Sequence, residues 1–86
     1  MGRKKVTGPA PIAGDHFAEH RAGEQTGRVI EVVDVLKTCV VSRTVGRTAT
    51  TMIELDSIRP HRNGWHLIKR DGRAVKWDGE KVVATS

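Results

Sequence analysis

Two Asp-Gly pairs near the C-terminus, Asp71-Gly72 and Asp78-Gly79, constrain the fold of this chain more than any other feature. Each pair separates two short runs rich in β-branched or aromatic residues. Asp-Gly is favoured in two-residue hairpin turns because both central residues of such a turn need positive φ angles. The sequence therefore predicts a three-stranded antiparallel meander over residues 65–84.

Three longer runs upstream also favour strands over helices. Residues 28–35, 38–45 and 48–55 are dense in Val, Ile and Thr. These branched side chains lose χ1 freedom in a helix, but they pack well on a pleated sheet. In the first run Ile30 and Val32 share one face by strict alternation, and Arg28 lies on that face near the beginning of the run.

The order of these segments predicts an all-β fold, a small antiparallel SH3-like barrel with a C-terminal hairpin extension. We expect a first strand at 14–17, a loop at 23–27, and a short 3₁₀ turn at 56–60 where Pro60 interrupts the ladder. An OB-type barrel is the alternative. The chain of 86 residues then divides into a flexible basic N-terminal tail (1–13), the barrel (14–70), and a hairpin (71–86) packed on or extending it.

Three short motifs, in a fixed order along the chain, resemble those of other small proteins. The motifs are GRVIEV at 27–32, VGRT at 45–48, and IRP at 58–60 followed after three residues by GWHLI. Over about residues 14–68 the chain resembles a set of small uncharacterised β-domain proteins of actinobacteria and their phages. It departs from them in a shorter link after Val35 and an added hairpin after Arg70. The resemblance implies one compact β domain and brings no known activity.

Positive charge dominates the chain, which carries a net charge of +5. Basic side chains gather on the predicted hairpins and in the first five residues, whereas acids gather in the first third, so we expect an anionic partner. With few aromatic residues, contacts to a phosphate backbone are favoured over base stacking. The predicted nucleic-acid-binding residues are Arg3, Lys4, Lys5, Arg43, Arg47, Arg62, Lys69, Arg70, Arg73, Lys76 and Trp77.

The sequence is also compatible with other binding functions. The same charge would attract an acidic face of a host protein, so a phage-type regulator or inhibitor is the alternative, and a minor structural component is the second alternative. We expect a monomer or weak dimer with no membrane partner, because no apolar run is long enough to span a bilayer. The single cysteine and the absence of an apolar leader region predict a cytoplasmic protein.

Catalytic and metal-binding chemistry is not expected. His16 and His20 are four residues apart, but they lie in a predicted strand and loop without a set of four zinc ligands. The sequence neighbours of Cys39 are Thr and Val, so we expect a buried, unreactive cysteine in a strand. No Gly-rich phosphate loop follows a strand and opens a helix. We therefore predict no enzyme, no catalytic residue, no metal and no cofactor.

Overall fold

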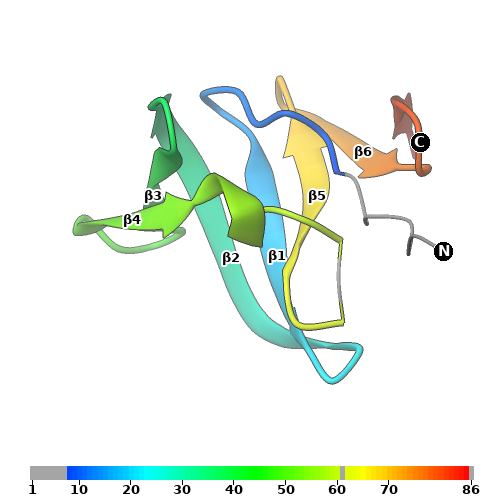
Figure 1. Ribbon diagram of the computed structural model, residues 1–86, viewed down its shortest axis with the longest axis horizontal. Helices are drawn as coiled ribbons and strands as arrows, with labels where there is room; N and C mark the ends of the chain where they lie inside the picture. Colours follow the sequence, from blue (N-terminus) through cyan, green and yellow to red (C-terminus); the bar gives the residue numbers. More distant parts are fainter. Residues whose placement is uncertain (1–7, 61, 86) are drawn as a thin grey trace, which may run out of the picture.

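The computed structural model describes residues 8–60 and 62–85, and in these residues seven antiparallel strands form one sheet (Figure 1). The order across the sheet is β4-β3-β2-β1-β5-β6-β7. The strands are β1 His16–Arg21, β2 Glu24–Val35, β3 Cys39–Thr44, β4 Thr50–Glu54, β5 Trp65–Arg70, β6 Arg73–Trp77 and β7 Val82–Ala84, and a 3₁₀ turn, η1, spans Leu55–Ser57. The predicted all-β fold is confirmed.

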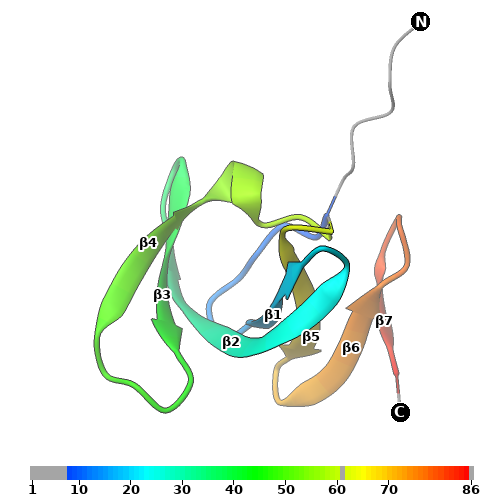
Figure 2. The ribbon, with the colours of Figure 1, turned by 90° about the horizontal axis from the view of Figure 1, so that it is seen from below.

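The sheet is curled but not closed, and irregular pairing accounts for the curl. An extra residue, Val33, sits in β2 opposite β3, and another, Ile68, sits in β5 opposite β1. Bulges of this kind bend a strand and increase its twist. Figure 2 shows the two ends of the sheet turned up on the same side, with η1 and the segment after it crossing between them. Because β4 and β7 are the outermost strands and do not pair with each other, the predicted SH3-like barrel is not confirmed.

The predicted loop over residues 23–27 is wrong. β1 and β2 form a long hairpin whose turn is only Ala22-Gly23, with Arg21 opposite Glu24. Both turn residues have positive φ, 52° for Ala22 and 83° for Gly23, as a tight hairpin requires. Alanine rarely adopts this conformation, so Ala22 is not recognisable as a turn residue from the sequence. The backbone N–H of Ala22 donates to Oδ1 of Asn63 at 2.8 Å, which helps to hold the turn.

The core fills the concave side of the curled sheet. It consists of Phe17, Ile30, Val32, Val40, Ile58, Trp65 and Leu67, with Ile53, Leu55, Val75 and Val82 packed at its margin. Ile30 and Val32, which the alternation places on one face of the strand, are both buried. Ile58 follows η1 and enters the core from the open side. The turn before β5 thus places an apolar side chain in the core. The predicted 3₁₀ turn before β5 is present, but it spans Leu55–Ser57 and not residues 56–60.

The described part of the predicted tail, residues 8–13, contacts the body of the protein. Pro9 is buried, and Gly8 lies so close to Pro60 that a Cβ on it would stand 3.0 Å from the proline Cδ. The carbonyl of Ala10 accepts a hydrogen bond of 2.9 Å from Arg70. A flexible tail is therefore not confirmed for residues 8–13, and residues 1–7 lie outside the described residues.

The predicted meander over residues 65–84 is confirmed, although its two turns differ. Asp71 and Gly72 both have positive φ, as expected for a two-residue turn. The second connection is wider, because Trp77 pairs with Val82. There Oδ1 of Asp78 accepts the backbone N–H groups of residues 80 and 81 at 2.8 and 2.9 Å. The aspartate thus shapes this turn through its side chain and not through a positive φ.

Candidate nucleic-acid interface

Two of the predicted binding residues already have carboxylate partners. Nη2 of Arg43 lies 2.6 Å from Oε1 of Glu31 on the neighbouring strand, and this bond lowers the pKa of Glu31. Arg70 donates to both oxygens of the buried Asp15, at 2.9 and 2.8 Å. Hydrogen bonding to that carboxylate raises the pKa of Arg70. Both guanidinium groups therefore serve first to hold the sheet together.

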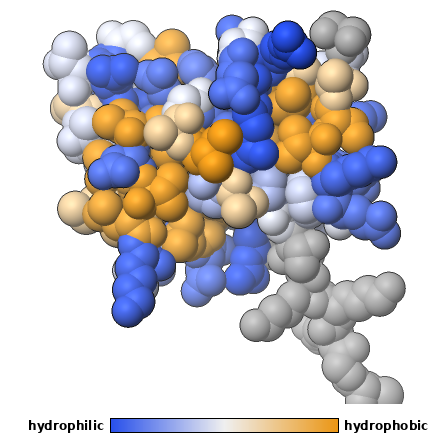
Figure 3. Space-filling view, turned by 90° about the horizontal axis from the view of Figure 1, so that it is seen from above, coloured by the Kyte–Doolittle hydropathy of each residue, from blue (hydrophilic) through white to orange (hydrophobic). Residues whose placement is uncertain are grey.

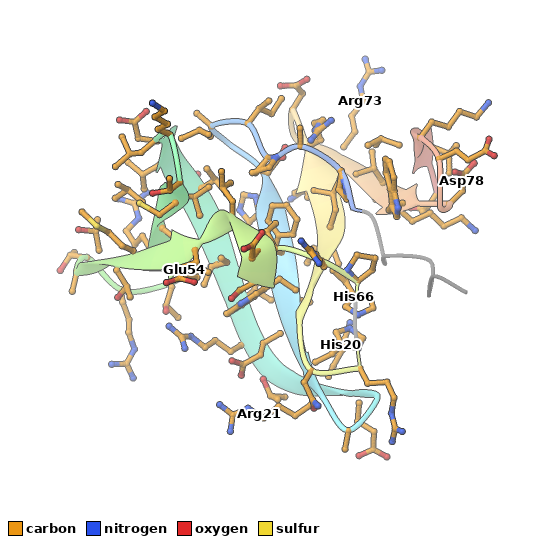
Figure 4. All side chains as sticks on the ribbon, viewed as in Figure 1. His20, Arg21, Glu54, His66, Arg73 and Asp78 are labelled. Atoms are coloured by element: carbon orange, nitrogen blue, oxygen red, sulfur yellow. The ribbon has the colours of Figure 1, made fainter. Side chains whose placement is uncertain are left out.

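The other described cations of the predicted set are exposed and form no ion pair with any described residue. Lys69, Arg73 and Lys76 lie on the β5–β6 hairpin, and Arg62 lies beside the β1–β2 turn, where its carbonyl accepts the N–H of Gly23 at 3.1 Å. These two places are at opposite ends of the molecule, as the labelled Arg73 and Arg21 show (Figure 4). The predicted cations therefore do not form one continuous patch. Arg3, Lys4 and Lys5 lie outside the described residues.

Trp77, the one aromatic residue in the predicted set, is half-buried. It pairs with Val82 across β6 and β7, and its indole Nε1 is buried without a hydrogen-bond partner among the described residues. Trp77 therefore does not present a fully exposed ring on which a base could stack.

The remaining predicted cation, Arg47, lines a groove between β2 and the β3–β4 hairpin. The groove has a volume of about 600 Å³ and is lined by Gly27, Arg28, Thr44, Arg47, Ala49 and Thr51. We call it the Arg28–Arg47 groove. Its described lining contains two guanidinium groups, two hydroxyls and no carboxylate. Two like charges facing one hollow raise its positive potential, which favours an anionic ligand.

The side chain of Arg28 is held in place on two sides. Its guanidinium carbon lies 5.6 Å from the centroid of the Trp65 ring, as in a cation–π contact. Its Nε donates to Oγ1 of Thr44 at 3.3 Å. The hydrogen bond to Thr44 uses only the Nε–H of the planar group, so its terminal nitrogens can bind an anion in a bidentate manner.

A bulge positions Arg28 on β2. Ala18 pairs with Val29, whereas His20 pairs with Gln25, so β2 accommodates two extra residues at this point. Gly27 lies within the bulge with a φ of 91°, a conformation that favours glycine. The strand irregularity thus sets the direction in which the next residue, Arg28, projects.

Arg28 was missing from the predicted set, although the sequence held a signal for it. The alternation of β2 placed a cation on the same face as two core residues, Ile30 and Val32. A charged side chain on that face keeps its charged group in solvent at the margin of the core. It therefore lines any hollow that opens there.

Trp65 also lines a second hollow. It has a volume of about 280 Å³ and is lined by Glu19, His20, Arg21, Ser57, Asn63, Gly64 and Trp65. We call it the Asn63 pocket. At its border the rings of His20 and His66 stack with centroids 3.7 Å apart, and Figure 4 shows the two side chains next to each other beside β5. Burial, followed by the charge of His66, lowers the pKa of His20.

Within residues 8–60 and 62–85, no three His, Cys, Asp or Glu side chains come together as a metal-ligand set. No helix of the described chain is both long and apolar enough to cross a membrane. Comparison of the chain with protein-family models, curated proteins and solved structures found no match.

Proposed function

We propose that the chain is a non-enzymatic binding module that binds the phosphate backbone of nucleic acid at the Arg28–Arg47 groove. The observation that carries this proposal is the pair of arginines in a hollow whose described lining has no carboxylate. Arg28 is already oriented by Trp65 and Thr44, so binding costs little side-chain entropy. The planar guanidinium fork matches the geometry of a phosphate group.

The second basic region supports the same function. Lys69, Arg73 and Lys76 are exposed on β5 and β6 and form no ion pair with the described residues. Figure 2 shows the β3–β4 and β5–β6 connections projecting from the same side of the curled sheet. An extended polyanion could therefore contact both connections while lying along one side of the protein.

The fold itself fits a module of this kind. β1 pairs with both β2 and β5, β2 to β4 form a meander, and η1 precedes β5. We propose that β1 to β5 are an opened variant of the SH3-like barrel, with β6 and β7 added at one edge. Small β domains of this size commonly present ligand sites in loops at the rim.

A salt titration tests the proposal. Anisotropy of a labelled nucleic acid should report binding at low salt, with a logarithmic slope of about −0.9 for each phosphate contact on B-DNA. The double variant Arg28→Gln and Arg47→Gln should make that slope less steep by about two contacts. Lys37→Gln is the control for charge, because Lys37 is exposed in the connection at the far end of β2. Absence of binding at ~50 mM salt, where such contacts are strong, would reject the proposal.

Exposed apolar side chains favour one second candidate, a regulator that binds an acidic protein. Met52 is 67% exposed on β4, an edge strand. Val33 and Val35 on β2 and Leu36 in the connection after it are also exposed. Figure 3 shows hydrophobic surface gathered on the side of β3 and β4. An edge strand can accept a further strand from a partner. If this candidate holds, capture of a partner from lysate should survive nuclease treatment and should be lost in Met52→Lys.

A further inference from the structure

Apart from the positive charge, the feature that indicates most about the ligand is the contact between Arg28 and Trp65. Trp65 is only 8% exposed, so its own ring face is not open to a ligand. The guanidinium carbon of Arg28 lies over that ring, 5.6 Å from its centroid, and Arg28 is itself exposed. Nucleic-acid bases stack on arginine planes as well as on aromatic rings. The scarcity of aromatic residues therefore does not prevent base stacking here, because Arg28 supplies the flat surface.

The Arg28–Arg47 groove has the size and chemistry of a site for one unpaired nucleotide. Its volume of about 600 Å³ falls within the range of about 300–1,000 Å³ that is usual for pockets that bury a small ligand. Arg47 and the hydroxyls of Thr44 and Thr51 are placed to bind phosphate and sugar, while Gly27 and Ala49 keep the floor open. A duplex presents its bases stacked inside a rod, so it could touch the rim but could not place a base in this hollow.

The Asn63 pocket extends the path, because Trp65 lines that pocket and contacts Arg28, which lines the Arg28–Arg47 groove. The pocket offers side-chain groups able to form hydrogen bonds with a base edge, those of Ser57 and Asn63 among them. Oδ1 of Asn63 already accepts the N–H of Ala22 at 2.8 Å, which fixes the orientation of the amide and leaves its NH₂ group as a donor. Two hollows that adjoin the Arg28–Trp65 contact provide places for two successive nucleotides.

We infer that these two hollows, with the Arg28–Trp65 stack between them, bind an unpaired segment of nucleic acid in preference to a duplex. The inference rests on the proposed function and specifies its ligand. One base stacks on the free face of Arg28, its phosphate binds at Arg47, and a neighbouring nucleotide enters the Asn63 pocket.

The test compares an oligothymidine of about twelve nucleotides, which is within the site size of small single-strand binding domains, with a duplex of equal length at one salt concentration. Arg28→Lys keeps the charge but removes the planar face. It should weaken binding of the oligothymidine on the order of tenfold, the loss expected for one stacked base, and should change duplex binding little. Arg59→Lys is the matched control, because Arg59 pairs with Asp56 outside both hollows.

Tryptophan fluorescence gives a second measurement that does not depend on the Arg28 variant. In Trp77→Phe the only remaining tryptophan is Trp65. Its emission should change on addition of oligothymidine and should change much less with duplex.

The outcomes separate this inference from the proposed function. Equal or tighter binding of the duplex, or an Arg28→Lys effect no larger than that of Arg59→Lys, would overturn the preference for unpaired strands and leave nucleic-acid binding in place. Absence of binding to both probes would overturn the inference and the proposed function together.

Discussion

The buried carboxylate of Asp15 and the guanidinium of Arg70 form a two-bond ion pair that joins the beginning of the sheet to the end of β5. The two hydrogen bonds measure 2.9 and 2.8 Å, and Asp15 is 0% exposed. Oδ2 of Asp15 also accepts the backbone N–H of Ile12 at 3.0 Å. Arg70 in turn holds the carbonyl of Ala10. One pair of side chains thus fixes residues 10–15 against the sheet.

Asp15→Asn should therefore be strongly destabilising. Removing one partner of a buried pair leaves the other charge uncompensated, which typically costs about 3–5 kcal/mol. We expect a loss of about 3 kcal/mol in the free energy of unfolding, because Arg70 retains partial access to water. Urea titration followed by circular dichroism measures the difference.

The control for Asp15 is Asp56→Asn, which removes the exposed partner of Arg59. Exposed pairs contribute about 0–1 kcal/mol, so this variant should be close to the parent in stability. Similar losses for the two variants would show that the Asp15–Arg70 pair has no special structural role.

The turn between β1 and β2 offers a stabilising substitution. Ala22 has a φ of 52°, and a left-handed conformation costs a residue with a Cβ roughly 1–2 kcal/mol. Asparagine tolerates this conformation, and Asn-Gly is the preferred pair in a two-residue hairpin turn. Ala22→Asn should raise the free energy of unfolding by about 1 kcal/mol, measured by denaturant titration.

Gly23→Ala tests the same turn in the opposite direction. Gly23 has a φ of 83°, so a Cβ there should lower stability. If Gly23→Ala were neutral and Ala22→Asn gave no gain, the positive φ angles of this turn would not limit stability.

The stacked histidines predict how stability depends on pH. The pKa of His20 is lowered in the folded protein from 6.5, chiefly by burial and then by the charge of His66. The unfolded chain therefore binds more protons in this range, so stability should fall as the pH drops below about 6.5. Glu19 and Arg21 flank His20 and line the same pocket.

Thermal melts between about pH 5.5 and 7.5, which spans the ordinary titration of histidine, check this dependence. His20→Gln should flatten it. His16→Gln is the control, since the His16 ring is not in the stack and contacts the Gly14 carbonyl at 3.2 Å. If the stability of His20→Gln depended on pH as steeply as that of the parent, His20 would not be the source of the dependence.

The strands could be predicted from the sequence because their signals are local. β-branched runs and the Asp71-Gly72 turn depend on neighbours along the chain, and these elements are confirmed. The β1–β2 hairpin was missed because its turn uses an alanine at positive φ. Closure of the sheet was expected from strand order alone, yet order does not determine whether β4 and β7 meet.

The candidate site was only partly predictable, because a cation's role depends on what lies opposite it. The register that brings Arg43 to Glu31 is not visible in the local sequence, and neither is the contact of Arg70 with Asp15. Arg28 acquires its orientation from a bulge at Gly27 and from a ring on another strand. The sequence could indicate Arg47 because this residue lies in a turn, where side chains are usually exposed.

Trp77→Phe should cost little stability despite the loss of a large aromatic side chain. The smaller ring buries less apolar surface, which lowers the free energy of unfolding. However, Nε1 of Trp77 is buried without a partner among the described residues, and such a group costs about 1–3 kcal/mol. Removing it should offset most of the lost packing, so we expect a net change within about 1 kcal/mol in urea titrations. Trp65→Phe is the comparison, because Trp65 belongs to the core and supports Arg28. A loss for Trp77→Phe as large as that for Trp65→Phe would mean that the indole N–H is satisfied in solution or that β6 and β7 depend on the full ring.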